Sequence, residues 1–227
     1  MGKNCIIHFT DKFQTLQSIL SVKSLRFCYC KEDFYLGTKK ISSAAHPMVS
    51  FSKFDINRLK NKVITYGKYG IAFSESWQTR KGINPVLYID NTSPVANALA
   101  SLLRARRNSE VSNLPGNLRL PIITLKCFTK NCVGFNSYFQ RDNFKFYEEN
   151  EWRFVPRKGE IGNGYISLDR KKYNKNKQEY NDRLISYGLK FSLEDIEAIF
   201  VKNEKQRQQV MSELSIEDTK VKIAKWH

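Results

Sequence analysis

Three short segments carry polar side chains at spacings that suit chemistry. Glu149 and Glu151 are two residues apart, so strand alternation would place both carboxylates on one face, within ~7 Å of each other. Carboxylates in that arrangement can accept or position a proton. His8 and Thr10 share a face for the same reason, and Ser50 lies in a Ser-Phe-Ser strand. Each pattern alone is also typical of an ordinary strand, so a functional interpretation depends on their occurring together.

Cysteines are the first candidates for a metal site. Cys28 and Cys30 are separated by one residue, and Cys127 and Cys132 by four. A zinc knuckle usually has two pairs separated by two residues, and neither pair here has that spacing. We therefore expect reduced thiols and no bound metal.

The elements that must hold these residues are short strands and a few helices. Alternation and turn residues predict strands over 4–9, 25–29, 48–52, 71–73, 84–89, 122–128, 145–147, 151–155, 165–166, 184–189, 198–201 and 221–223. Periodicity predicts helices after Asp11, over 94–103 and over 204–214, with a helical turn over 193–197. Long loops are expected over 129–143 and 170–181, the second one flexible. This order predicts an α+β fold in one domain, residues 1–227.

Composition limits the class of partner. Hydrophobic residues make up 41% of the chain and aromatic residues 13%, which is enough to fill a core. Lys and Arg number 38 against 22 Asp and Glu, a net charge of +16, and such a surplus attracts nucleic acid or acidic proteins. No apolar run reaches the ~18 residues that a membrane span needs. We expect a cytoplasmic protein with no membrane contact.

Five motifs in one order carry a family resemblance. They are HFT at 8–10, PMVSF at 47–51, YGKYGIAF at 66–73, NPVLY at 84–88 and EWR at 151–153. With them the chain resembles the AbiGi-type abortive phage infection proteins over nearly its whole length. That family is described as an antitoxin partner.

The same layout is similar, more distantly, to the DarT-like ADP-ribosyltransferases. This resemblance implies a split β-sheet core with flanking helices and NAD as co-substrate. It makes Glu151 the catalytic residue, whose carboxylate would stabilise the oxocarbenium-like ribose as nicotinamide leaves, with Glu149 assisting. The residues implied for NAD binding are His8, Phe9, Thr10, Ser50, Phe51, Tyr69 and Phe73.

In transferases of this kind, the loop before the catalytic glutamate commonly contacts the acceptor. Basic side chains interleaved with aromatic ones suit a phosphate backbone with splayed bases. The residues predicted to contact nucleic acid are Lys130, Tyr138, Arg141, Lys145, Arg104, Arg107, Lys171 and Lys172. The resulting hypothesis is a phage-defence toxin that ADP-ribosylates nucleic acid, single-stranded RNA slightly favoured over DNA, and that a cognate antitoxin protein keeps silent.

Three alternatives stay open on the sequence. A transferase of the same chemistry would label protein instead of nucleic acid. A catalytically inactive antitoxin would bind nucleic acid or a toxin and would neither bind NAD nor harm the cell. A metal-dependent nuclease would use Asp55 and Glu148 with Glu149 and Glu151, but acidic residues on two strand faces argue against a converging metal cage.

Overall fold

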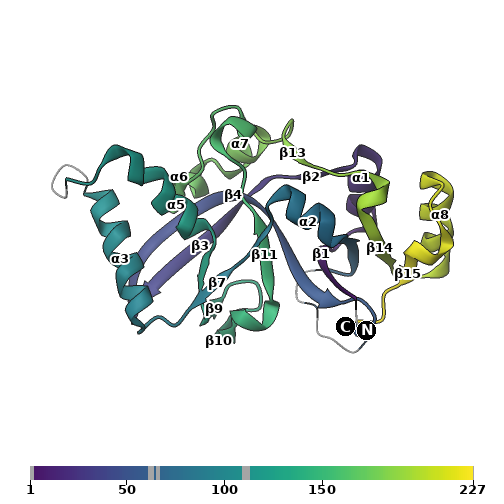
Figure 1. Cartoon of the computed structure of the whole chain (residues 1–227), viewed down its shortest axis with the longest axis horizontal. Helices are drawn as coiled ribbons and strands as arrows, with labels where there is room; N and C mark the ends of the chain where they lie inside the picture. The colour runs from purple at the N-terminus through teal and green to yellow at the C-terminus, as the bar shows by residue number, and fades with distance from the viewer. Residues whose placement is uncertain (1–2, 61–63, 65–66, 109–112, 227) are drawn as a thin grey trace. The chain divides into compact units, whose positions relative to one another are not determined.

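The computed structural model describes residues 3–60, 64, 67–108 and 113–226, which form two compact units (Figure 1). Unit 1 comprises residues 1–26, 49–83 and 188–227, and unit 2 comprises residues 27–48 and 84–187. Each unit combines strands with helices, which confirms the predicted α+β class. Tyr66, the first residue of the motif at 66–73, lies outside the described residues.

Unit 1 is built around a sheet in which β1 is a central strand. The strands of unit 1 that belong to this sheet are β1 (Asn4–Thr10), the part of β4 (Lys39–Asp55) that follows Met48, β5 (Tyr69–Phe73), β14 (Ile196–Val201) and β15 (Val221–Ile223). The strands β2 (Ser24–Arg26) and β13 (Gly188–Lys190) form a separate antiparallel pair. The helices of unit 1 are α1 (Phe13–Val22), α2 (Glu75–Lys81) and α8 (Glu204–Leu214), with 3-10 helices at Leu193–Asp195 and Asp218–Lys220. The strand β1 pairs antiparallel with both β4 and β5, β14 pairs antiparallel with β5, and β15 pairs parallel with β14.

Apolar residues on one face of this sheet form the core of unit 1. Ile7, Ala72 and Phe200 come from three of its strands and are at most 3% exposed. The ring of Trp226 lies 5.5 Å from that of Phe9 and covers the edge of this core, and its indole N–H donates to the carbonyl of Gly67. The helix α1 begins after Lys12 and not after the predicted cap Asp11, without a side-chain cap.

Unit 2 combines a long antiparallel pair with several short strands. Its strands are β3 (Cys28–Leu36), the first part of β4, β6 (Asn84–Pro85), β7 (Leu87–Ile89), β8 (Thr129–Asn131), β9 (Val133–Asn136), β10 (Arg141–Lys145), β11 (Glu151–Phe154) and β12 (Leu168–Asp169). Its helices are α3 (Pro94–Arg107), α5 (Arg119–Cys127), α6 (Arg170–Lys175) and α7 (Lys177–Asp182), with 3-10 helices at Gly116–Leu118, Phe146–Glu149 and Lys158–Ile161.

The pairing within unit 2 brings distant segments together. β4 pairs with β3 and also with β12, β7 runs parallel to β8, and β11 pairs with β6. The helices α3 and α5 pack against each other and bury Leu99, Leu103 and Ile122 in one core with Phe34 of β3 and Ile41 of β4. The strand β8 therefore lies next to β7, although about forty residues separate them in sequence.

The strands predicted over 84–89 and 151–155 and the helix over 94–103 are confirmed in unit 2, as are elements at both ends of the chain, but other predictions in unit 2 are wrong. The strand predicted at 165–166 does not form, and β12 lies at Leu168–Asp169 instead. Residues 122–128 form most of helix α5 and not a strand, because Ile122, Ile123 and Cys127 bury one helical face. The predicted loop 129–143 contains β8 and the hairpin of β9 and β10. The predicted strand 145–147 belongs to the end of β10 and the 3-10 helix Phe146–Glu149.

The predicted loop over 170–181 also has regular structure. It forms the helices α6 and α7. Asp169 caps α6 by accepting the backbone N–H groups of Lys171 and Lys172, and Tyr173 and Tyr180 anchor the two helices in the interior. The segment is otherwise polar and rich in lysine, so these two buried tyrosine rings provide the apolar surface by which both helices pack against the rest of unit 2.

Candidate functional site

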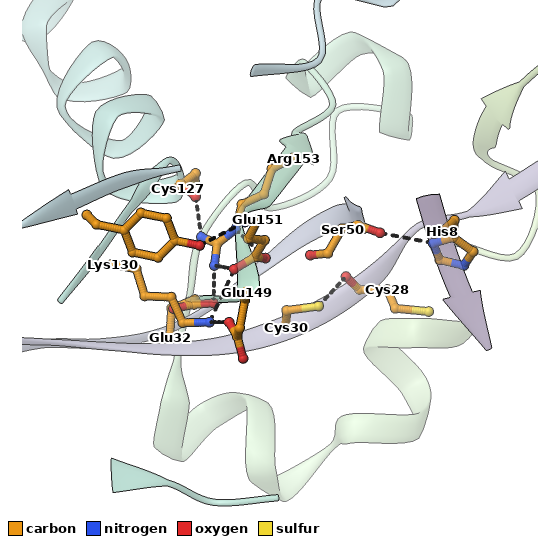
Figure 2. Close-up of polar contacts among 11 residues, drawn as sticks. His8, Cys28, Cys30, Glu32, Ser50, Cys127, Lys130, Glu149, Glu151 and Arg153 are labelled. Carbon is orange, nitrogen blue, oxygen red and sulfur yellow. Dashed lines mark hydrogen bonds and ion pairs between the residues drawn. The ribbon is translucent and has the colours of Figure 1, made fainter. Parts of the chain in front are cut away.

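A buried cluster of charged side chains lies in unit 2 and is centred on Arg153 (Figure 2). Arg153 lies on β11, is fully buried, and donates to both carboxylate oxygens of Glu151 over 2.8 and 3.0 Å. It also donates to Glu32 of β3 over 2.6 Å and to the carbonyl of Cys127 over 2.6 Å. Because residues 151 and 153 alternate along one strand, their side chains share a face and can pair directly.

Lys130 supplies the second cation of the cluster. Its ammonium group lies 2.8 Å from the carboxylate of Glu149 and 3.2 Å from that of Glu151. The Lys130 side chain is 14% exposed, and the two glutamate side chains are 6% and 11% exposed. Lys130 was predicted to contact nucleic acid, but its charge is already neutralised by two carboxylates away from solvent.

Glu149 joins this cluster, but it does not lie on one strand with Glu151 as predicted. It is the last residue of the 3-10 helix Phe146–Glu149, and Asn150 then adopts a left-handed backbone conformation with φ of 43° before β11 begins at Glu151. The two carboxylates therefore meet through a sharp turn and through their shared contact with Lys130, and not through alternation along a strand.

The electrostatics of the cluster favour the charged forms of its two cations. Burial alone would lower the pKa of Lys130 and Arg153, but the surrounding carboxylates, Glu151 foremost, outweigh it and raise both pKa values. The backbone N–H of Glu151 donates to the hydroxyl of Tyr88, whose pKa burial raises to about 12. Both oxygens of Glu151 thus accept from cations. Two cations and three carboxylates form a buried ion cluster that joins β3, β8 and β11.

Two further polar groups are buried in unit 2. Among the described residues, the ammonium group of Lys126 and Nε2 of His46 have no hydrogen-bond partner. Burial lowers the pKa of both, that of His46 to about 3, so the imidazole is neutral. Nδ1 of His46 lies 3.1 Å from the carbonyl of Ile166, to which the neutral ring donates when Nδ1 carries the proton. His46 thereby attaches the segment before β12 to β4.

A row of aromatic rings leads from the ion cluster to the hairpin of β9 and β10. The ammonium group of Lys130 lies 4.4 Å from the centre of the Phe146 ring. The Phe146 ring contacts that of Phe144, which stacks on Phe139, which meets Tyr138 edge to face. The hairpin is thus supported by side chains that connect it to the buried charges.

Backbone geometry fixes the same hairpin. Gly134 faces Phe146 closely: a Cβ atom there would lie 3.3 Å from the ring, a tight contact that the ring would have to shift to accommodate. At the turn, the buried side chain of Asn136 accepts the backbone N–H groups of Tyr138 and Phe139 over 2.9 and 3.2 Å. Such an Asx turn holds the chain in place through a local side-chain contact.

The hairpin exposes large apolar side chains. Phe135 is 54% exposed, Tyr138 60% and Phe139 43%. Val133 shares the outer face of β9 with Phe135, and Tyr147 follows β10 with 45% exposure. We call residues 133–149 the aromatic hairpin. Several exposed large apolar side chains on one short segment indicate a binding surface.

The residues predicted to bind NAD through the early motifs lie in unit 1, whereas Glu149 and Glu151 lie in unit 2. Nδ1 of His8 lies 3.0 Å from the carbonyl of Ser50, and the rings of His8 and Phe51 are 5.9 Å apart. Burial lowers the pKa of His8. Thr10 and Tyr69 are partners across β1 and β5, and the Phe73 ring packs in the core against Trp77. Phe9 contacts Trp226. Their role in NAD binding stays a prediction.

The remaining predicted nucleic-acid residues of unit 2 lie on three separate elements. Arg141 and Lys145 are exposed on β10 together with Asp142, and Glu148 is exposed in the 3-10 helix that follows. Arg104 and Arg107 lie in the last turn of α3, and Arg107 donates to the carbonyl of Ile41 over 2.6 Å. The third pair, Lys171 and Lys172, is exposed on α6. A small hollow at the hairpin is lined by Arg141, Asn143, Phe144, Lys145 and Glu148.

Sequence reasoning missed two groups that hold the site. Arg153 and Glu32 were not assigned a role, although the E-x-R alternation at 151–153 was a usable signal for an ion pair on one strand face. In the described part of the chain, no group of three or more His, Cys, Asp or Glu residues could hold a metal ion. None of its helices is long and apolar enough to cross a membrane.

Comparison with known proteins gives one match. A family model described as "putative abortive phage resistance protein AbiGi, antitoxin" matches residues 23–202. No curated protein matches the chain. No solved structure matches it either. Because the matching description names an antitoxin, the prediction that the chain is the toxin of its system is wrong. ADP-ribosyltransferase activity and the use of NAD stay predictions.

Proposed function

This chain belongs to the family of putative AbiGi abortive phage resistance antitoxins, and we propose that it neutralises a protein toxin by binding it directly. The observation that carries the proposal is the aromatic hairpin, with Phe135, Tyr138 and Phe139 each more than two fifths exposed. A toxin partner follows from the antitoxin description of the family.

The composition of the aromatic hairpin suits a protein partner. Aromatic residues are enriched at protein interfaces and supply most of the binding energy at a few positions. Residues 133–149 contain two cations, Arg141 and Lys145, and three anions, Asp142, Glu148 and Glu149, so their net charge is −1. This segment therefore does not share the overall positive charge of the chain, and a polyanion gains little from it.

The buried ion cluster has a supporting role in this proposal. Lys130 contacts Glu149, Glu151 and the Phe146 ring, and so links the base of the hairpin to β8 and β11. A surface held in one conformation before binding loses less entropy when the complex forms. The glutamates earlier expected to act on NAD are here positioning residues, and the ADP-ribosyltransferase-like core is a hypothesis about fold alone.

The direct test is neutralisation in cells. Expression of the chain alone should leave growth unchanged, expression of the toxin of the same abortive-infection system should arrest it, and co-expression should restore it. The variant Phe135→Ser with Tyr138→Ser removes two exposed rings and should abolish both restoration and co-purification of the toxin. Loss of one interface hot spot typically costs about 2 kcal/mol or more, roughly thirtyfold in affinity.

A matched control separates binding from folding. Val22→Ser with Ile185→Ser also removes two exposed apolar side chains, 64% and 59% exposed, but outside the hairpin. This control should neutralise as the natural chain does. The proposal fails if the hairpin variant, still folded by circular dichroism, restores growth fully, or if the chain by itself arrests growth.

A further inference from the structure

We propose that unit 2 carries a second binding surface, formed by Tyr165 and the lysines of α6 and its C-terminal neighbour Lys177, and that its ligand is single-stranded RNA. We call this the Tyr165 surface. It includes Lys171, Lys172 and Lys175, whose side chains are exposed, as is that of Lys177 (Figure 1 shows α6 and α7). It does not depend on toxin binding, because the residues that carry it are not those of the aromatic hairpin.

The first argument is local charge. Residues 157–177 contain seven cations and two carboxylates, a net charge of +5, and of the seven cations Arg170 is paired with Asp33 outside the segment. Both carboxylates are engaged with the backbone: Glu160 accepts the N–H of Arg157 over 2.6 Å, and Asp169 accepts those of Lys171 and Lys172 over 2.9 and 3.1 Å. A phosphate backbone is the ligand that gains most from such a surplus, because it releases condensed counterions on binding.

The second argument is the exposed ring of Tyr165. It is 51% exposed, and the ammonium group of Lys172 lies 5.5 Å from its centre. The backbone around the ring is fixed, since the Tyr165 carbonyl accepts the hydroxyl of Tyr29 over 2.7 Å and the Ile166 carbonyl contacts His46. A fixed, exposed ring beside lysines provides a stacking platform for an unpaired base next to contacts for its phosphates.

The polar residues between the lysines favour RNA. Asn174 and Asn176 are exposed and alternate with Tyr173, Lys175 and Lys177. An amide side chain offers both a donor and an acceptor, which matches the 2′-hydroxyl that distinguishes RNA from DNA. A double-stranded ligand would hide its bases from Tyr165, so we assign the surface to a single strand.

The test is fluorescence anisotropy with a labelled twelve-nucleotide RNA of uridines, measured on the full chain over a range of salt concentrations. Lys171→Glu with Lys172→Glu should weaken binding at least tenfold and reduce the slope of log affinity against log salt by about 1.4, since each phosphate contact contributes about 0.7 for a single strand. Tyr165→Ser should weaken binding by about tenfold with little change of that slope.

Controls decide between this ligand and others. Lys202→Glu with Lys205→Glu makes the same change in net charge on exposed residues of unit 1 and should bind RNA nearly as the natural chain does. Equal loss in this control would overturn the proposal, because attraction would then be a property of overall charge. Equal binding of duplex DNA, of a deoxyuridine oligonucleotide or of poly-glutamate would also overturn it. Toxin neutralisation by the Lys171→Glu, Lys172→Glu variant should persist.

Discussion

The aromatic hairpin and the Tyr165 surface belong to the same unit and differ in almost every respect. The hairpin carries a net charge of −1 over residues 133–149, whereas residues 157–177 carry +5. The hairpin exposes three large aromatic rings and is connected through Phe146 to a buried ion cluster, while the Tyr165 surface exposes one ring among lysines. Two partners of different chemistry can therefore bind without competing for the same side chains.

The unequal net charges of these two segments show that the total charge of a chain does not identify its binding sites. The chain has a net charge of +16, but the aromatic hairpin contributes no positive net charge to it. Lys130, which looks like a phosphate contact in the sequence, forms buried ion pairs with Glu149 and Glu151. Lys171 and Lys172 look the same in the sequence, but both are exposed on α6, and Asp169 accepts hydrogen bonds from their backbone N–H groups only.

The largest effect should come from Arg153→Met, which removes the support of the hairpin. Glu32 and Glu151 would each lose the guanidinium partner that now neutralises them in the interior. Breaking a buried ion pair on one side typically costs about 3–5 kcal/mol of unfolding free energy. Urea unfolding followed by tryptophan fluorescence should show this loss, and the variant should no longer neutralise the toxin.

Its control is Arg183→Met, which breaks an exposed ion pair with Glu179 on α7. That change should lower the unfolding free energy by less than about 1 kcal/mol. A loss of similar size in both variants would mean that the buried cluster does not support unit 2 as described.

The stability of the folded chain should depend on pH through the buried His46. The pKa of His46 is about 3 in the folded chain and about 6.5 when unfolded, so the unfolded state binds more protons between these values. Stability should therefore fall as pH falls from 6.5 towards 3, by up to about 1.4 kcal/mol per pH unit for this group. The charged groups that lower this pKa, after burial itself, are Lys126, Arg153 and Arg106.

The comparison is made with His46→Asn, whose amide nitrogen can replace Nδ1 as the donor to Ile166 but does not titrate. Urea unfolding at pH 4, 5 and 6 should give a shallower pH dependence for this variant. RNA binding by the folded chain should not change between pH 4 and 6 on account of His46, because its imidazole stays neutral there and keeps its contact with Ile166. Parallel pH dependence in both chains would show that His46 is not the responsible group.

A smaller change, Asn136→Ala, should affect the hairpin alone. It leaves the backbone N–H groups of Tyr138 and Phe139 without their acceptor at the turn. Loss of such contacts costs about 1–2 kcal/mol. Toxin affinity measured by calorimetry should fall, while RNA affinity stays unchanged. A simultaneous loss of RNA affinity would refute the independence of the two surfaces.

The smallest effect is expected for Lys145→Gln on β10. Its ion pair with Glu148 spans 3.7 Å, and both side chains are more than half exposed. The unfolding free energy should change by less than about 0.5 kcal/mol. RNA affinity should stay within about twofold, because Lys145 makes no phosphate contact in the proposed complex. Lys172→Gln removes such a contact and should weaken RNA binding more. Anisotropy titrations of both variants measure this directly.

Much of the fold could be predicted where local pattern and burial agree. The helix α8 follows from its cap Asn203, and α3 from Ser93, which accepts the backbone N–H of Ala96, followed by Pro94 at the first helical position. The helix α5 could not be predicted, because its consecutive Ile122 and Ile123 favour a strand on propensity alone. Packing against α3 decides its structure.

The site was harder to predict than the fold. The sequence drew attention to Glu149, Glu151 and Lys130, and the structure brings these three together. The use of that cluster could not be predicted, since the burial of Lys130 depends on two carboxylates about twenty residues further along the chain. Arg153, which pairs with Glu151, also pairs with Glu32 of β3, and Glu32 is more than a hundred residues away in sequence.

The interleaving of the two units along the chain has a consequence for their synthesis. Unit 2 is complete in sequence once residue 187 has been translated, whereas unit 1 still requires residues 188–227, which contribute β13, β14, β15 and α8. At roughly 5–20 residues per second, those 40 residues take several seconds to follow. Both proposed surfaces are thus translated in full before the ribosome has made the last strands of the sheet that contains β1.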